Sequence, residues 1–270
     1  MKDQMKETMD TTMEQVQQEV DSGRVPWYRF SRRTQILATV YLLLFVLFTA
    51  LAWFVHFHPI FAVDVAITRE FQENKSPWLK SFMVAISYFG NHIIVFTALI
   101  VLTALAFWLV RLRLEALIIV TLSVVSSAIN FLIKVIVSRP RPVTTHLVDV
   151  FQSATGQSFP SGHVMSYVAF WGLVFSLGLI LFNRKRWWHY VLLIIPAFFV
   201  IMVGASRIYL GDHWASDVLG GYLFGGLLLG ITLTIYLRLK AKGVWAPKPK
   251  TGAKKTLTQN SVPVASKPVN

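Results

Sequence analysis

Six long stretches of uncharged or nearly uncharged residues dominate this chain. They lie near residues 36–57, 91–110, 114–137, 163–182, 187–206 and 215–237. Each has roughly the 20 residues that an α-helix needs to cross a bilayer. The composition agrees, since 54% of the 270 residues are hydrophobic and only 14% are charged, unlike an ordinary soluble domain. The sequence therefore predicts an all-α fold, a polytopic membrane helix bundle of six transmembrane helices.

Basic residues outside the motifs described below predict the orientation of this bundle. They gather in four groups, and six spans place all four groups on one side of the membrane. Lys and Arg favour the cytoplasmic side of short loops. We therefore expect a multi-pass plasma-membrane protein with cytoplasmic N and C termini and external connections at 58–82, 138–162 and 207–214. The groups are Arg29, Arg32 and Arg33; Arg111 and Arg113; Arg184, Lys185 and Arg186; and Arg238, Lys240 and Lys242.

Charge and composition divide the chain into three parts. We expect a cytoplasmic N-terminal segment at 1–33, a six-span domain at 34–238, and a basic, disordered cytoplasmic tail at 239–270. The net charge of +13 is the kind of excess that nucleic-acid-binding proteins carry, but eight of the basic residues follow Tyr236 in a stretch without acids. Anionic lipid head groups suit such a tail. We therefore expect the chain to interact with the lipid bilayer and with no nucleic acid.

Glycines in the last stretch indicate close helix packing. Gly221 and Gly225 have the spacing that lets two membrane helices approach closely. We expect this face to pack within the bundle first, and to support a homodimer as the alternative. The chain has no cysteine, which excludes disulfides, a thiolate nucleophile and a Cys-based metal site.

The first polar motif runs from Lys134 to Pro142, at the end of the third apolar stretch. Pro140 and Pro142 push the residues before them out of the helical region, which predicts that the helix breaks near Ser138. A helix end followed by an extended turn can bring Lys134 and Arg141 toward one anion, and an ammonium with a guanidinium fork suits a phosphate. The alternative is a Lys that reaches the membrane interface, with Arg139 and Arg141 as ordinary loop charges.

The second motif, Phe159 to His163, comes directly before an apolar stretch. Ser161 and Gly162 therefore lie where a helix begins, and the unpaired backbone N–H groups of a helix start bind anions. Gly162 allows close approach to a ligand, Ser161 adds a hydroxyl, and His163 adds a titratable imidazole. The alternative is a Ser cap followed by an interfacial histidine.

The third motif contains Ser206, Arg207, His213 and Asp217. The i, i+4 spacing predicts that His213 and Asp217 share one face of a helix. A carboxylate there can accept a hydrogen bond from one imidazole nitrogen and leave the other free to attack. An ionisable group beside hydrocarbon costs about 2.5–3.5 kcal/mol, so an unpaired Asp217 is unfavourable. The alternative is a plain helical ion pair.

Taken together, the three motifs indicate a phosphate site. All lie at the outer ends of predicted spans, and together they supply charge stabilisation, a nucleophile, an orienting base and a general acid. At this point the chain resembles the type 2 phosphatidic acid phosphatase superfamily. It matches the three-part signature of that family in order, without a gap or substitution: Lys134-x6-Arg141-Pro142, Pro160-Ser161-Gly162-His163 and Ser206-Arg207-x5-His213-x3-Asp217.

The resemblance covers residues 36–237, and the six-span layout is similar to the membrane lipid phosphatase branch of the family. It implies that Lys134, Arg141 and Arg207 hold the phosphate with help from Ser161 and Gly162. It also implies that His213 is the nucleophile, that Asp217 orients it and that His163 protonates the leaving oxygen. Neither a metal nor another cofactor is implied.

Three functions remain open at this stage. The leading hypothesis is hydrolysis of a membrane lipid phosphate, with undecaprenyl diphosphate, phosphatidylglycerol phosphate and phosphatidate as candidates. A lipid phosphotransferase would share the covalent step and differ only in the acceptor. An anion transporter is the third, and it is disfavoured because transport sites tend toward the membrane midplane while these motifs lie at one face.

Overall fold

The computed structural model describes residues 32–143, 148–151, 155–181 and 187–244, and every regular element within them is helical. The N-terminal segment expected at 1–33 lies almost entirely outside the described residues, as does most of the tail expected at 239–270. The elements are α2 (Arg32–Phe57), α3 (Ala62–Phe71), α4 (Pro77–Asn91), α5 (Ile93–Leu109), α6 (Arg113–Val137), α7 (Gly162–Tyr167), the π-helical η1 (Val168–Gly172), α8 (Leu173–Leu181), α9 (Trp187–Tyr209) and α10 (Ala215–Ala241).

Five described helices or continuous helical runs are long and apolar enough to cross a membrane. These are Thr34–Phe57, Arg113–Val137, Gly162–Leu181, His189–Tyr209 and Ala215–Ala241. The sixth predicted span, at 91–110, is not one straight helix. The α5 helix has 17 residues and extends only about 26 Å at the usual rise, less than the hydrocarbon core. A crossing there needs α4 as well, and the two helices meet at a bend of 56°.

The α10 helix is central to the packing, because α2, α6, α7, η1, α3 and α9 all contact it. Its glycines make these contacts close. A Cβ atom on Gly220 would lie 2.5 Å from the Phe159 ring, and one on Gly221 would lie 3.0 Å from the Ser161 carbonyl oxygen. The expected packing of the glycine face within the bundle is confirmed at these positions. The homodimer stays a prediction.

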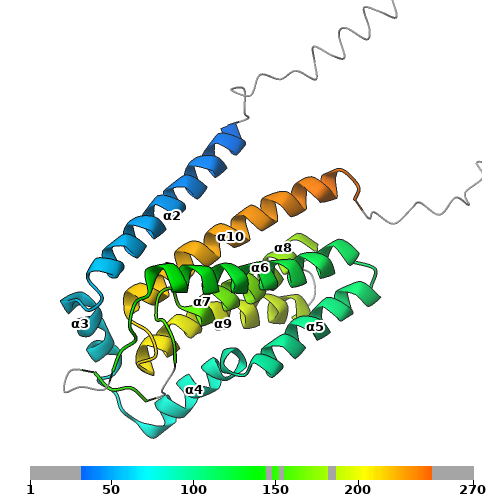
Figure 1. The fold of residues 1–270 in the computed structure, drawn as a ribbon. Helices are drawn as coiled ribbons and strands as arrows, with labels where there is room; N and C mark the ends of the chain where they lie inside the picture. The colour runs from blue at the N-terminus through cyan, green and yellow to red at the C-terminus, as the bar shows by residue number, and fades with distance from the viewer. Residues whose placement is uncertain (1–31, 144–147, 152–154, 182–186, 245–270) are drawn as a thin grey trace, which may run out of the picture.

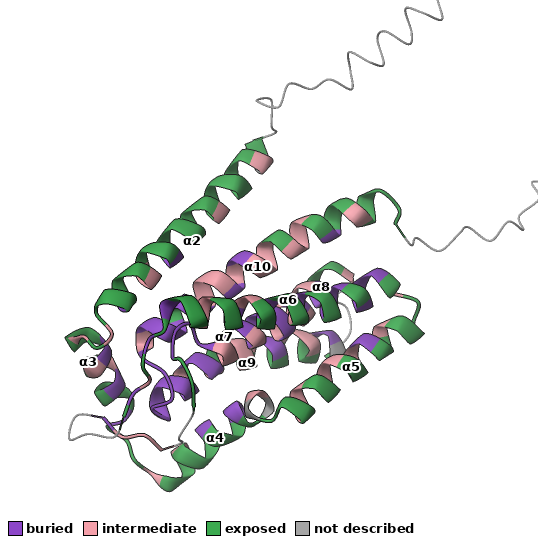
Figure 2. Ribbon diagram, in the orientation of Figure 1, coloured by how far each residue is buried: buried purple, intermediate pink, exposed green. Residues whose placement is uncertain are grey.

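The two ends of the bundle differ in what they carry. Figure 1 shows α3, the α6–α7 connection and the α9–α10 turn together at one end, while α2 begins and α10 ends at the other. In Figure 2 the buried positions concentrate around α7, α9 and α10, and α2 is mostly exposed. Its exposed side chains include Ile36, Leu42 and Trp53, as suits a helix that faces lipid.

A polar cluster at the end away from α3 joins α6 to α10. Glu115 is buried and accepts hydrogen bonds from Tyr236 Oη at 2.8 Å and Lys240 Nζ at 3.1 Å. An unpaired buried carboxylate is costly, so these partners stabilise the helix pair. The cluster contains none of the motif residues.

Candidate active site

The first motif adopts the predicted helix break. The α6 helix ends at Val137, and Ser138 follows with a left-handed φ of 50°. One turn earlier, Lys134 Nζ donates to the carbonyl oxygens of Gln157 at 2.6 Å and Ser158 at 3.1 Å. Lys134 therefore fixes the segment that leads into the second motif.

The second motif starts a helix as predicted. Ser161 is the N-cap of α7, Gly162 is its first residue and His163 lies in its first turn. Within the described part of the chain, Ser161 Oγ and His163 Nε2 are buried without a hydrogen-bond partner. Buried polar atoms are nearly always paired, so a polar ligand at this point would satisfy both atoms.

The third motif differs from the prediction in one respect. His213 lies in the turn before α10, which begins at Ala215, so His213 and Asp217 do not share a helical face. The turn passes through Gly211, with φ of 73°, where a Cβ atom would lie 2.2 Å from the Asp149 carbonyl oxygen. Asp217 sits in the first turn of α10, where a carboxylate is favoured.

His213 and Asp217 nevertheless lie side by side. Both are buried, at 1% and 0% exposure, and His213 Nδ1 is 3.6 Å from Asp217 Oδ2. That oxygen also accepts from the backbone N–H of Trp214 at 2.9 Å and from the hydroxyl of Ser158. Asp217 is thus fixed by several donors and faces the Nδ1 edge of the imidazole.

Arg141 lies on the opposite edge of the His213 ring. Its Nη1 atom is 3.2 Å from His213 Nε2 and donates to the Asp212 carbonyl oxygen at 2.7 Å. A guanidinium can only donate, so this contact requires an unprotonated Nε2, which assigns the ring proton to Nδ1 on the Asp217 side.

The electrostatics of the loop favour a neutral imidazole at His213. Burial lowers the pKa of His213 well below the usual range, and the positive charges of Arg141, Lys134 and Arg207 lower it further. Burial also lowers the pKa of Arg141, while the negative charge of Asp217 opposes that shift. A neutral His213 keeps a lone pair on Nε2, the requirement for a nucleophile.

Arg207 reaches the site from the end of α9. It is buried, forms an ion pair with Asp212, and donates from Nη1 to Ser87 Oγ at 2.9 Å. Ser87 in turn lies 2.6 Å from Ser206 Oγ. These contacts fix Arg207 against α4. The hydroxyl of the preceding residue, Ser206, attaches α9 to the same helix.

The structure thus brings the motif residues to one end of the bundle. Arg141, His213 and Asp217 are linked directly. Lys134 joins them through Ser158, and the backbone N–H of Ser161 donates to the Asp217 carbonyl oxygen at 3.0 Å.

Sequence reasoning missed the partners of these residues and read Arg139 as a loop charge. The partners are Asp64, Ser87, Ser158, Asp212 and Ser216. Two features of the sequence could have indicated some of these partners: Asp212 stands directly before His213, and the Arg-Pro pair occurs twice in succession at residues 139–142.

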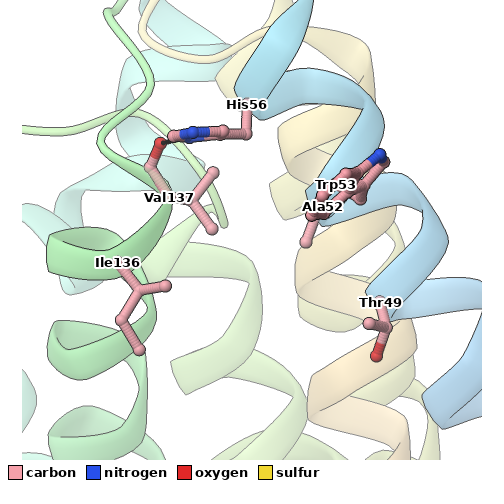
Figure 3. Close-up of a pocket in the computed structure, with 6 residues that line it drawn as sticks. All are labelled: Thr49, Ala52, Trp53, His56, Ile136 and Val137. Carbon is pink, nitrogen blue, oxygen red and sulfur yellow. Dashed lines mark hydrogen bonds between the residues drawn. The ribbon is translucent and has the colours of Figure 1, made fainter.

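An apolar pocket of about 290 Å³ lies beside the first motif, between α2 and α6. Figure 3 shows its lining, with the His56 ring reaching toward α6; His56 Nδ1 is 2.9 Å from the Val137 carbonyl oxygen. The other lining residues are Thr49, Ala52, Trp53 and Ile136. Ile136 and Val137 lie within the first motif, but no lining residue is one of the charged motif residues that are expected to hold a phosphate, so this pocket is not the site of phosphate chemistry.

Comparison with known proteins identifies a family and several relatives. The family model of the PAP2 superfamily matches residues 114–241. Phosphatidylglycerophosphatase B of Bacillus subtilis (strain 168) is 29% identical over 187 residues, which are 68% of this chain and 89% of that relative. Undecaprenyl-diphosphatase BcrC of the same organism is 33% identical over 143 residues, 53% of this chain and 67% of that relative.

A solved structure is similar across most of the fold. The crystal structure of the first transmembrane PAP2 type phosphatidylglycerolphosphate phosphatase from Bacillus subtilis superposes with a TM-score of 0.63 at 28% identity, covering 74% of this chain and 96% of that one. The chain belongs to the PAP2 superfamily. It is a multi-pass membrane phosphatase, a hydrolase of phosphoric ester or diphosphate bonds.

Proposed function

We propose that this phosphatase removes a phosphoryl group from a membrane lipid through a phosphohistidine on His213. The contact between Arg141 Nη1 and His213 Nε2, at 3.2 Å, carries the proposal. It leaves the lone pair of Nε2 facing the phosphate-binding cations and the Nδ1 proton facing Asp217. A nucleophile needs this tautomer, with a carboxylate to stabilise the charge that develops on the ring.

The covalent step follows from these positions. When a phosphate binds, Arg141 turns from Nε2 to the phosphate oxygens, and Lys134, Arg207 and the Ser161–Gly162 helix start share the negative charge. The Nε2 lone pair forms the N–P bond as the P–O bond of the leaving group breaks. His163 gives its proton to that oxygen. His163 then takes a proton from water, which attacks phosphorus and breaks the N–P bond.

The substrate is a prenyl diphosphate or a phosphoglycerolipid phosphate. The names of the two relatives, a phosphatidylglycerophosphatase and an undecaprenyl-diphosphatase, support this choice, and the charged cluster suits the phosphate common to both. The test is phosphate release by detergent-solubilised protein from undecaprenyl diphosphate, phosphatidylglycerol phosphate and phosphatidate side by side. Hydrolysis of at least one is expected. Absence of phosphate release from all three, with label passed to a lipid acceptor, would indicate a phosphotransferase.

We expect hydrolysis to continue in EDTA. In the proposed mechanism the charge of the phosphate is balanced by Lys134, Arg141 and Arg207, and hard divalent cations need several oxygen ligands. Within the described residues no group of three or more His, Cys, Asp or Glu side chains is placed to hold a metal ion. Rates should be equal with and without the chelator. Full loss that added Mg²⁺ restores would contradict the mechanism.

The site faces the outside of the plasma membrane, with both termini in the cytoplasm. The distribution of basic residues supports this part of the proposal, and the absence of native cysteine makes a labelling test clean. Glu73 near the site end and Lys242 after α10 are both exposed. An impermeant thiol reagent on intact cells should label Glu73→Cys and leave Lys242→Cys unlabelled. The reverse pattern would invert the orientation.

A further inference from the structure

A buried chain of charges links α3 to the proposed catalytic carboxylate. Arg139 Nη2 is 2.6 Å from Asp64 Oδ2, and Arg139 Nη1 is 2.6 Å from Asp217 Oδ1. Both Arg139 and Asp64 are 1% exposed. Buried charges persist only with close partners, and here one guanidinium bridges two carboxylates that lie far apart in the sequence.

The contacts divide the two oxygens of Asp217 between two tasks. Oδ1 accepts from Arg139, while Oδ2 faces His213 Nδ1. Asp64 fixes the same region from the other side, because its carboxylate accepts from the backbone N–H of Ser216 at 2.9 Å and from its hydroxyl at 2.6 Å. Arg139 and, through Ser216, Asp64 therefore hold the Oδ1 side of Asp217, away from the oxygen that faces the imidazole.

The charges of this cluster also have a consequence for His213. A guanidinium paired with Asp217 alone would cancel the negative charge that stabilises an imidazolium. Asp64 supplies a second carboxylate, so Asp64, Arg139 and Asp217 together keep one net negative charge. We infer that Asp64 and Arg139 are positioning residues for Asp217, with Asp64 preserving the negative charge beside His213.

The inference rests on the proposed roles of His213 and Asp217, and it extends the functional unit into α3, outside the matched region 114–241. Arg139→Gln and Asp64→Asn should each lower kcat by roughly 10- to 100-fold, the range seen when partners that orient a metal ligand are removed. KM should change little, because neither side chain is among those that hold the phosphate.

A double-mutant cycle separates positioning from an independent role. In the Asp217→Asn background, adding Arg139→Gln or Asp64→Asn should lower kcat little further, because the group that they position is already altered. Additive losses would overturn the inference while leaving the role of Asp217 intact. Full activity of Asp217→Asn alone would remove the proposed role of Asp217 and the inference together.

The dependence of kcat/KM on pH separates the proposed role of Asp64 from a loss of stability, because a loss of stability does not shift the acid limb. The charged or titratable groups around His213 are Lys134 from α6, Arg141 from the following loop, His163 from α7, Arg207 from α9 and Asp217 from α10. Asp64→Asn leaves all five in place and removes one negative charge. The pKa of His213 should fall, so the acid limb of kcat/KM should move to lower pH. An unchanged limb would overturn the inference.

Glu115→Gln is the matched control, since it also removes a buried carboxylate from an ion pair, with Lys240. It should lower thermal stability and leave both kcat and the acid limb unchanged. All rates are to be compared per folded protein, measured by gel filtration in detergent. If Asp64→Asn is not recovered folded, the Arg139→Gln cycle with Asp217→Asn decides the question.

Discussion

The His213→Ala protein is expected to form no phosphoenzyme and to release no phosphate above the uncatalysed rate. The methyl group of alanine offers no lone pair. The other imidazole of the site, His163, lies in the first turn of α7, and within the described residues its Nε2 atom has no hydrogen-bond partner. The measurement is trapping of ³²P-labelled protein after a short incubation with labelled lipid phosphate. The quench must be alkaline, because a phosphohistidine is labile to acid.

The control for this variant is His58→Ala, which removes an exposed imidazole whose Nδ1 atom lies 3.2 Å from the Phe54 carbonyl oxygen, away from the three motifs. It should keep full labelling and full turnover. His213 is buried among cations, so its removal is not expected to unfold the protein, and a thermal unfolding curve verifies this. Labelled His213→Ala protein would exclude His213 as the nucleophile.

Much of the fold was predictable because its determinants are local. Twenty apolar residues in a row specify a membrane helix by length alone, and prolines 140 and 142 specify where α6 stops. The start of α7 at Gly162 follows from a Ser-Gly pair before an apolar run. In each case the signal and the structure lie within a few residues of one another.

The bend between α4 and α5 was not predictable in this way. Lys80 lies in α4, so the residues before 83 read as an external connection, and the span seemed to begin at 91. In the structure the helix starts at Pro77, and the chain bends by 56° before α5 continues. A charged residue in an otherwise apolar helix thus hid the helix that precedes α5.

The contacts that complete the site were hidden for a different reason. Asp64 and Arg139 are separated by 75 positions, and Ser158 meets Asp217 across 59. No local spacing encodes such pairs, so Arg139 read as a loop charge. The i, i+4 argument for His213 and Asp217 placed them together for the wrong reason, since the contact is made across the turn that precedes α10.

The cations of the site are held in place by protein partners. Lys134 donates to two backbone carbonyls, Arg141 to Asp212 and His213, and Arg207 pairs with Asp212. A phosphate must compete with these neutral or singly charged acceptors. Its two negative charges make it the stronger partner for a guanidinium, so in the proposed mechanism the exchange frees His213 Nε2 for attack.

Replacing His163 should have an effect that depends on the leaving group. Without a general acid, cleavage of an alkoxide leaving group should slow by about 10²–10⁴-fold in kcat/KM. An aryl phosphate, whose leaving oxygen needs no proton, should lose far less. The variant His163→Gln is preferable to Ala, because it keeps an amide donor and most of the volume that packs against Gly90 but transfers no proton.

The same variant should also accumulate phosphoenzyme. The aryl substrate still transfers its phosphoryl group to His213, because that step no longer depends on an acid, whereas hydrolysis of the N–P bond needs a base to activate water. Rapid mixing should therefore show a burst of aryl alcohol followed by slow phosphate release. Equal losses of kcat/KM on alkyl and aryl substrates would contradict the acid role. The two roles would be exchanged if the burst were lost when His163 is replaced and phosphoenzyme still formed in His213→Ala. The labelled imidazole would then be His163.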